Sequence, residues 1–537
     1  MRSSRSWCNR VPTSSLAPFR HRQYAVLWAA TVLANIGTWM YSAAAGWLMT
    51  TLDPSPVMVA MVQAATTLPM FLFAMPAGAL ADILDTRRYL IVVEALIIVF
   101  AVPMALLASH GAMTAGLLLA FTFFIETGAA LGAPAWQSIV PRLVPREDLP
   151  AAVAANAVGF NISRALGPAL GGVIAAAFGH AAPFWVNAFS NAGSITALGF
   201  ARPRRARTTA LPAERFLGAL RAGVRHARNN PPLRATLVRA IAFFFFAAAY
   251  WALLPLVARD QVAGGPQLYG MLLGAIGVGA IGGAGLLPRL EASIGADRLV
   301  SAAQVGTACA LLLFACARSQ PVAFAASLIA GVCWIAGVSR LNVSSQMSLP
   351  DWVRARGLAL HVALALGAMT LGSVAWGQVA SAFGLVAAHV AAAAGALAAL
   401  PLALRYRLQA GAGLDLSPSM HWPTPVVSGH LQGDEGPVMV SVEYRVEEAN
   451  RAAWFAENRA LERQRRRNGA YAWEMFEDAG DRGRFVETFH VESWLEHLRQ
   501  HDRQTEADRR ADERVRALSR GEPRVTHLVA AYPEQNA

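Results

Sequence analysis

Long apolar runs separated by short polar segments fill residues 24–405. A helix that crosses a lipid bilayer needs about 20 mostly apolar residues. The pattern predicts twelve such helices, at residues 24–49, 57–81, 89–109, 113–138, 149–178, 182–201, 236–258, 268–288, 298–317, 321–345, 356–382 and 385–405. We therefore expect an all-α membrane protein with twelve transmembrane helices.

Arginines mark every second loop between these runs. They occur in the N-terminal segment, after the last span and after the second, fourth, eighth and tenth, and nine lie in residues 202–235. The alternate loops hold almost none, with Arg259 and Arg318 as the exceptions. Because cytoplasmic loops carry the excess of basic residues, the pattern predicts a multi-pass protein of the plasma (inner) membrane with both termini in the cytoplasm.

Glycines repeat along the chain at one constant offset. Gly167, Gly172 and Gly179 correspond to Gly372, Gly377 and Gly384, each 205 residues further on. Many secondary transporters consist of duplicated units. We predict two six-helix halves, residues 1–201 and 236–408, joined by a basic cytoplasmic loop at 202–235.

Composition and charge separate the membrane part from the rest of the chain. The chain is 55% hydrophobic and 15% charged, against about 25% charged in soluble domains. Residues 1–414 have a net charge of +17 and residues 415–537 a net of −5, which together give the total of +12. The basic excess lies in short loops, so it indicates topology and contact with membrane lipid rather than nucleic-acid binding.

The acidic part has its own pattern of elements. After a Pro/Gly/Ser-rich linker at 409–437, strands are predicted at 438–446, 470–478, 484–492 and 525–531, with helices at 447–467 and 493–520. The order β-α-β-β-α-β is ferredoxin-like. We expect residues 438–537 to form a small soluble α+β domain in the cytoplasm.

The loop after the second span carries the most specific motif. Residues 78–88 read GALADILDTRR. This resembles the loop signature of the major facilitator superfamily, although Asp85 stands where that family usually has glycine. The resemblance implies the major facilitator fold and a gating role, rather than substrate binding, for Gly78, Asp82, Arg87 and Arg88. The glycine is expected to allow close helix approach, and the arginines to anchor at the headgroups.

A second motif lies in the predicted fifth span. Residues 163–172 read SRALGPALGG, which is similar to the antiporter signature of the same superfamily, with Ser163 in place of its first glycine. The resemblance assigns that signature to Gly167, Pro168, Gly171 and Gly172 and favours export over import. Tight packing through small residues, without any bearing on direction, is the alternative.

Charged side chains inside a membrane are costly and are usually functional. Glu126 and Arg164 lie about halfway through the predicted fourth and fifth spans. We expect Glu126 to be the proton-coupling carboxylate and Arg164 its partner; a static ion pair that fixes helix packing is the alternative. Glu94, one to two turns into the third span, is expected simply to reach the cytoplasmic interface.

Polar and aromatic side chains within the spans are candidates for lining a substrate cavity. Aromatic rings of the first and seventh spans, which face the cavity in the superfamily, could stack on a substrate, although an interfacial belt or core role is equally compatible. The candidate set is Asn35, Trp39, Gln63, Tyr250, Trp251 and Asn342.

Two further resemblances concern function. The stretches at 19–24, 45–47 and 69–82 resemble the superfamily branch that includes the enterobactin exporter. The stretches at 444–446, 469–474 and 492–501 resemble antibiotic-biosynthesis-monooxygenase domains, in which the sheets of two chains pack together. The first resemblance implies proton-driven export of a siderophore or similar small molecule. The second implies a dimerisation or regulatory module, with an enzyme as the alternative.

The expected protein is therefore a proton-coupled exporter of a small molecule, a siderophore, drug or amphipathic metabolite, that works by alternating access. Its partners are that substrate, protons and lipid, with a homodimer through the C-terminal domain as an option. We expect no catalytic residues, no cofactor and no metal: His497 and His501, spaced i,i+4, are interpreted as a solvated helix face rather than ligands. A membrane-tethered monooxygenase and an importer of the same fold are the alternatives.

Overall fold

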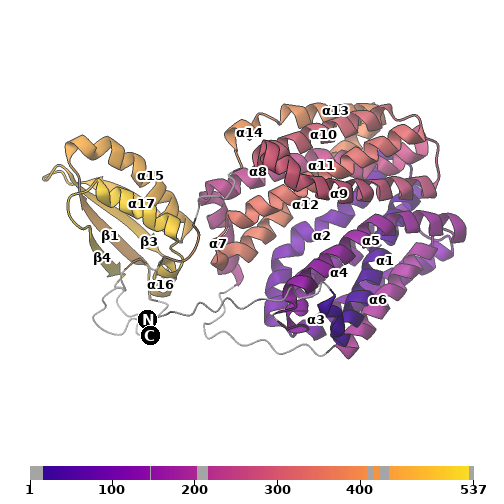
Figure 1. Cartoon of the computed structure of the whole chain (residues 1–537), viewed down its shortest axis with the longest axis horizontal. Helices are drawn as coiled ribbons and strands as arrows, with labels where there is room; N and C mark the ends of the chain where they lie inside the picture. The colour runs from indigo at the N-terminus through magenta and orange to yellow at the C-terminus, as the bar shows by residue number, and fades with distance from the viewer. Residues whose placement is uncertain are drawn as a thin grey trace, which may run out of the picture. The chain divides into compact units, whose positions relative to one another are not determined.

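Helices occupy almost all of the chain up to residue 405 (Figure 1). The structure is a computed structural model that describes residues 16–145, 147–201, 216–408, 415–419, 421–422 and 435–530. The helices are η1 (Ala17–Arg20), α1 (Arg22–Leu52), α2 (Pro56–Ile83), α3 (Thr86–Ser109), α4 (Ala115–Ile139), η2 (Val140–Arg142), α5 (Leu149–Phe178), α6 (Ala182–Phe200), α7 (Phe216–Asn229), α8 (Pro231–Leu256), a π-helical turn η3 (Val257–Gln261), α9 (Pro266–Ile294), α10 (Ala296–Cys316), α11 (Gln320–Met347), α12 (Asp351–Phe383), α13 (Leu385–Ala398) and α14 (Leu402–Arg405).

Within the described residues, nine of these helices are long and apolar enough to cross a membrane: α2 to α4 and α8 to α13, some with a short helical extension. Helices α1, α5 and α6 lie at the positions of the other three predicted spans, but they are not apolar enough to be counted among these nine. Helix α6, for example, buries Asn187, Asn191 and Ser194. The structure therefore confirms a mostly helical membrane protein, and the count of twelve spans stays a prediction.

The repeated glycines have a common structural role at the helix ends. Gly179 follows α5 with φ +86°, and Gly384 follows α12 with φ +87°. A positive φ is accessible to glycine at little cost, whereas other residues are strained there. The repeat at an offset of 205 residues thus ends two corresponding helices in the same way.

The chain folds into two units. The first lies within Met1–Pro212, Arg239–Leu341 and Val362–Arg405, and the second within Ala213–Val238, Asn342–His361 and Tyr406–Ala537. The second unit therefore combines the acidic domain with α7, the first residues of α8 and the turn between α11 and α12. The predicted loop 202–235 is partly helical, because it contains α7.

The acidic domain has a four-stranded antiparallel sheet with the order β2-β3-β1-β4. The strands are β1 (Val438–Arg445), β2 (Tyr471–Glu477), β3 (Arg484–Val491) and β4 (Arg524–Val529). Helix α15 (Arg451–Arg467) connects β1 to β2, and the predicted second helix is two, α16 (Trp494–Asp502) and α17 (Glu506–Ala517). Apart from that break, the predicted order of elements is confirmed.

One face of this sheet forms the core of the domain. Buried and half-buried residues alternate along β1 and β3, because successive side chains of a strand point to opposite faces. Trp454, Phe485 and Phe489 are among the buried aromatic residues. Helices α15 and α17 cover this face (Figure 1). The opposite face leaves Tyr471, Phe476 and Leu528 exposed.

Candidate functional site

A cationic side chain lies among three tryptophans within the helical unit. The guanidinium carbon of Arg164 on α5 is 5.9 Å from the ring centroid of Trp39 on α1, 6.0 Å from that of Trp251 on α8 and 5.7 Å from that of Trp334 on α11. Arginine over an aromatic face is attracted by the ring quadrupole. The four side chains come from both predicted halves, so they form a polar-aromatic centre between them.

Two of these tryptophans were expected to line a cavity, and Arg164 was expected to be functional, but Trp334 was not singled out from the sequence. It lies in an apolar span with no polar neighbour in the chain to mark it. Tyr250 is fully buried against Trp251 and Phe314. Gln63 and Asn342 are half-buried on α2 and α11, and a cavity role for them stays a prediction.

Glu126 lies apart from this centre. Its neighbour is Tyr41 of α1, which is fully buried beside Thr122 and Glu126 of α4. Within the described residues, Arg164 forms no ion pair, and its Nε has no hydrogen-bond partner. The Glu126–Arg164 pair expected from the sequence is therefore not formed in this conformation, and a role of either residue in proton coupling stays a prediction.

Glu94 does not reach an aqueous interface. Its side chain is buried at 5% exposure and accepts a hydrogen bond of 3.1 Å from the indole Nε1 of Trp136 on α4. The expectation that it would extend to the cytoplasmic surface is wrong, because α4 presents a tryptophan donor at the same depth.

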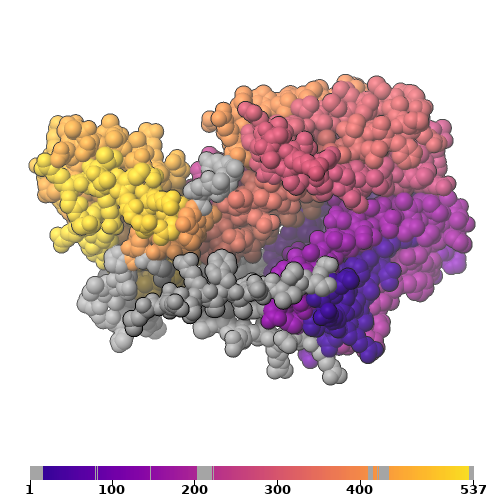
Figure 2. Space-filling model, viewed as in Figure 1, coloured from indigo at the N-terminus to yellow at the C-terminus, as the bar shows by residue number. Residues whose placement is uncertain are grey.

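The antiporter-like motif packs α5 against two helices at once. A Cβ on Gly167 would lie 2.4 Å from Cβ of Trp39, and one on Gly172 would lie 2.5 Å from the backbone oxygen of Pro266 on α9. Gly270 of α9 meets the backbone of Pro168 in the same way, at 2.6 Å. Figures 1 and 2 show α5 and α9 side by side. Small residues thus allow contact between the predicted halves, as the packing interpretation required.

Helices α2 and α12, which also come from different predicted halves, are in close contact through small residues as well. The hydroxyls of Thr67 and Thr370 are 2.7 Å apart, and a Cβ on Gly377 would lie 2.7 Å from Cβ of Ala60. The close contacts involve the first half of α2 and of α9 and the second half of α5 and of α12. Because the twelve predicted spans, which do not include α7, alternate in direction, these regions are expected to lie at the same end of the bundle.

The loop motif is built differently from the sequence expectation. Asp85 caps α3 by accepting from the backbone N–H of Arg88 at 2.9 Å. The Nε of Arg87 donates to the carbonyl of Leu198 at 2.7 Å, near the C-terminal end of α6. A Cβ on Gly78 would meet nothing within 4 Å, so this glycine is not a point of close helix approach. The side chain of Asp82 lies outside the described residues.

The two arginines of this loop provide a matched pair of variants. Arg87 is half-buried and satisfies carbonyls at a helix end, whereas the side chain of Arg88 is exposed. Cations at helix C-termini stabilise by about 0.3–1 kcal/mol, and charged hydrogen bonds by about 1.5–3 kcal/mol. We expect Arg87→Ala to lower the thermal midpoint of the purified protein and to slow transport, with Arg88→Ala close to the parent. Equal effects would contradict a capping role for Arg87.

Asn35 lines a separate small cavity of about 170 Å³ in the helical unit. Its walls come from α1, α4, α5 and η2 and include Trp28, Trp136 and Phe160. Asn35 therefore lines a cavity, and its role in substrate binding stays a prediction.

The acidic domain contains a larger cavity, of about 480 Å³, between its sheet and its helices. Its polar lining includes Arg465 and Asp512, whose nearest side-chain atoms are 3.5 Å apart. Burial opposes the charge of Arg465, but Asp512 and Glu487 raise its pKa above the ordinary value. Small-molecule sites are typically concave spaces of about 300–1,000 Å³ with a few polar groups, and this cavity fits that description.

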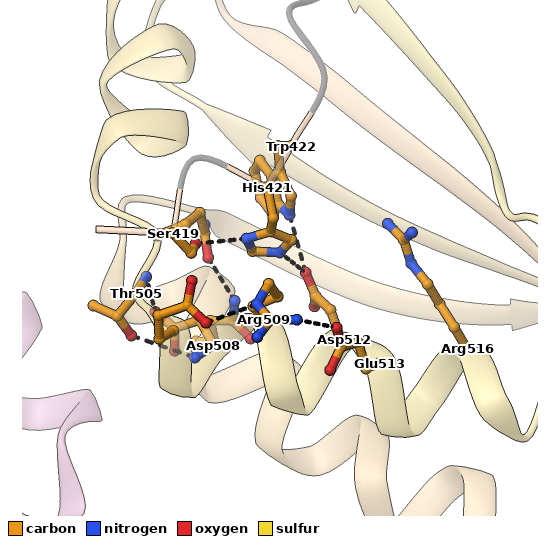
Figure 3. Close-up of polar contacts among 12 residues, drawn as sticks. Ser419, His421, Trp422, Thr505, Asp508, Arg509, Asp512, Glu513 and Arg516 are labelled. Carbon is orange, nitrogen blue, oxygen red and sulfur yellow. Dashed lines mark hydrogen bonds and ion pairs between the residues drawn. The ribbon is translucent and has the colours of Figure 1, made fainter. Parts of the chain in front are cut away.

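Trp422 of the predicted linker lines this cavity, and the linker residues beside it bond to one another and to α17 (Figure 3). Oδ2 of Asp512 accepts from the indole Nε1 of Trp422 at 3.0 Å and lies 2.8 Å from Nε2 of His421. Ser419 bonds Nδ1 of the same imidazole at 2.7 Å. The described part of the linker is therefore fixed to α17.

Three histidines meet at the cavity wall. His497 and His501 lie one turn apart on α16, and His527 comes from β4; one ligand nitrogen from each lies within 4.8 Å of the others. Burial lowers the pKa of His497 to about 3 and that of His501 to about 4, and it also lowers the pKa of His527. All three are therefore neutral at neutral pH. The interpretation of His497 and His501 as a solvated face is wrong, because His497 is buried.

Helix α16 also contacts the other elements of its unit. Oε1 of Glu496 accepts from Arg225 of α7 at 3.3 Å and from Arg503 at 2.6 Å. The guanidinium of Arg503 lies 4.5 Å from the ring centroid of Trp352 at the start of α12. Burial and the nearby arginines lower the pKa of His226, which packs on the same tryptophan, to about 3. Helix α16 is therefore bound to α7 and to the first turn of α12.

Comparison with known proteins decides the family. The model of a family described as transmembrane secretion effectors, a major facilitator group, matches residues 13–535. The chain belongs to this family. As a transmembrane secretion effector of the major facilitator superfamily, it is a multi-pass membrane transporter.

Several relatives of this secretion effector are efflux proteins. It is 23% identical over 365 residues to the staphyloferrin A transporter of Staphylococcus aureus, covering 67% of this chain and 89% of the relative. It is 26% identical to the multidrug efflux pump Tap of Mycolicibacterium fortuitum, covering 67% and 90%. Macrolide efflux protein A of Streptococcus pyogenes is 22% identical, with 48% and 67% covered.

Solved structures give the fold. The nucleoside transporter NupG superposes with a TM-score of 0.60 at 12% identity and covers 72% of this chain and 98% of its own. The human organic anion transporter MFSD10 gives 0.53 at 17% identity, with 71% and 99% covered. At these identities the likeness establishes the transporter fold alone, and that part of the expectation is confirmed.

Proposed function

We propose that this secretion effector exports an amphipathic small molecule across the plasma membrane by alternating access, in exchange for protons. The observation that carries the proposal is the Arg164 centre, because a cation that three tryptophans flank, and that forms no ion pair with the residues the structure describes, suits a ligand with both acceptor and apolar groups. The siderophore and drug transporters among its relatives support this substrate class. A siderophore-export role of the enterobactin branch belongs to the same proposal.

In this proposal all twelve long helices span the membrane, including α1, α5 and α6, and both termini lie in the cytoplasm. The halves meet at the end where α5 contacts α9 and α2 contacts α12. With the predicted topology this is the outer end, so the conformation is open toward the cytoplasm. The Arg164 centre would then receive substrate from inside the cell.

The substrate is identified by comparing metabolites in the culture medium of cells with and without the gene. A compound that is depleted from the medium without the gene is exported, and one that accumulates there favours the importer alternative. No gene-dependent difference in any metabolite would count against the proposal. The compound found then serves as the substrate in everted vesicles.

Proton coupling is tested on two carboxylates of the bundle, Glu126 and Glu94. We expect Glu126→Gln to abolish proton-driven uptake of that compound into everted vesicles, since glutamine cannot exchange a proton. Glu94→Gln, which keeps the hydrogen bond to Trp136 possible through its carbonyl oxygen, is the matched control and should retain coupling. If Glu126→Gln transported normally on a proton gradient, the assignment of Glu126 would be wrong.

For the acidic domain we propose dimerisation or regulation. The outer face of its sheet exposes Tyr471, Phe476 and Leu528 at 44–49%, and apolar patches of this kind commonly mark protein contacts. The resemblance to monooxygenase-like domains, whose sheets pair across two chains, supports a homodimer. The cavity of about 480 Å³ is the observation that favours a second candidate, a membrane-tethered enzyme. Oxygen-dependent turnover of the exported compound by the purified full chain would favour the enzyme over a module for dimerisation or regulation.

A further inference from the structure

The three histidines at the cavity of the acidic domain are placed as metal ligands would be. We propose that His497, His501 and His527 bind one divalent transition-metal ion, with a fourth coordination position open to the cavity. The proposal is independent of the transported substrate and of proton coupling.

The spacing of the nitrogens is the first observation. Nε2 of His497 and Nε2 of His501 are 3.3 Å apart. A tetrahedral ion with metal–nitrogen bonds of about 2.0–2.1 Å places two of its ligands about 3.3 Å from each other. The pair on α16 therefore already has the separation of two ligands of one ion, and β4 supplies the third imidazole within 4.8 Å.

Burial supplies the second observation. His497 is 1% exposed, and its Nδ1 has no well-formed hydrogen-bond partner among the described residues; the carboxamide of Gln500 is the polar group beside it. Because the ion would be held through Nε2, Nδ1 is left to face the Gln500 carboxamide, as the second nitrogen of a metal-bound imidazole usually faces a hydrogen-bond partner. A direct imidazole–imidazole hydrogen bond alone would explain the contact of His497 with His501. It would not explain why His527 approaches the same point.

The surroundings suit a metal with an open position. The ring of Trp494 lies 5.4 Å from His497 and 6.1 Å from His527, and Trp422 lies 5.0 Å from His501, so indole rings shield the cluster. All three histidines line the cavity, which leaves the remaining side accessible to a small ligand. Two arginines line that cavity: Arg465 is balanced by Glu487 and Asp512, and Arg516 pairs with Glu522.

The ligand set narrows the choice of ion. Three imidazoles without carboxylate or thiolate suit Zn²⁺, Cu²⁺, Fe²⁺ or Ni²⁺ rather than Mg²⁺ or Ca²⁺, which prefer oxygen ligands. Three protein ligands and one open position characterise zinc sites that bind water or a substrate, whereas purely structural sites have four protein ligands. We therefore expect the site to bind a metal and then an exogenous ligand.

The test uses the full chain, purified in detergent without a histidine tag, stripped with a chelator and titrated with Co²⁺ at neutral pH. We expect one Co²⁺ per chain, with the visible absorption of a tetrahedral nitrogen-ligated ion, and its displacement by Zn²⁺. Mutation of residues that only hydrogen-bond to a metal's ligands lowers metal affinity by about 10–100-fold. His527→Gln and His501→Gln remove ligands themselves, so they should weaken binding by more than this. His490→Gln on β3, which replaces a histidine outside the cluster, should bind as the parent does.

Folding is checked separately, because a histidine in a core can be structural. Near-ultraviolet circular dichroism and the thermal midpoint are compared for each metal-free variant. Loss of the Co²⁺ spectrum in a folded His527→Gln protein supports the site, and so does a rise in the parent's thermal midpoint with Zn²⁺ that this variant lacks. No stoichiometric uptake by the parent, or uptake that is unchanged in His527→Gln, would overturn the proposal.

Discussion

Arg164→Ala is expected to lower export of the transported compound by about 10- to 100-fold. A hydrogen bond between a charged donor and its ligand contributes about 1.5–3 kcal/mol, and each 1.4 kcal/mol corresponds to a factor of ten in affinity. The variant would also leave Trp39, Trp251 and Trp334 without the cation that they surround. The measurement is the concentration dependence of uptake into everted vesicles, with the amount of protein in the membrane determined by immunoblot.

Two conservative variants separate charge from shape at this centre. Arg164→Lys keeps the charge but loses the planar, stacking guanidinium, so an intermediate defect is expected. Trp251→Phe keeps an aromatic face and should change the apparent substrate affinity more than the maximal rate. If Arg164→Ala transported with the affinity of the parent, the residue would be a packing element, and the substrate would bind elsewhere.

Gly172→Ala is expected to impair export more strongly than any other alanine substitution at the glycines of the two motifs. Its Cβ would meet a backbone oxygen at 2.5 Å and a backbone Cα at 3.0 Å on α9, and neither can rotate away. Overpacking of this kind costs about 1–3 kcal/mol. Only the conformation in which α5 and α9 touch is destabilised, so the population of that conformation would fall by about 5- to 150-fold.

Gly78→Ala is the matched control, because the same methyl group would enter open space there. Alanine is favoured over glycine inside a helix by about 0.5–1 kcal/mol, so this variant should be as stable as the parent or more so. Export rates and the thermal midpoints of both purified proteins give the comparison. Similar export by the two variants would show that the α5–α9 contact is not part of the transport cycle.

The fold of this chain was accessible from local patterns. Apolar length and loop arginines predicted the helices, because the bilayer dictates both. Alternating strands and two helical stretches predicted the order of the elements of the acidic domain, although the second stretch, predicted as one helix, is divided into α16 and α17. Gly179 and Gly384 identified corresponding helix ends. Helix α6 shows the limit of such patterns, since its buried Asn187 and Asn191 lower its hydropathy although Asn191 hydrogen-bonds to Asn187 within the same helix.

The sites depend on contacts that are distant in sequence, and most of them were therefore missed. Trp334 joins Arg164 from a helix 170 residues away, and nothing in its own apolar span distinguishes it. His527 joins His497 and His501 only because β4 pairs with the central strand of the sheet. The i,i+4 spacing on α16 is compatible with a metal, but the surrounding arginines and glutamates favoured a solvated helix face.

Helix α16 is only nine residues long, yet its side chains contact two different parts of the unit. His497 and His501 face the cavity, while Glu496 holds Arg225 of α7, the helix in the connection between the two predicted halves. A short helix moves as one rod, so a ligand that drew the histidines toward the cavity would pull on Glu496 by a comparable distance. Binding in the cavity of the acidic domain would thus also be felt at α7, within the connection between the two predicted halves.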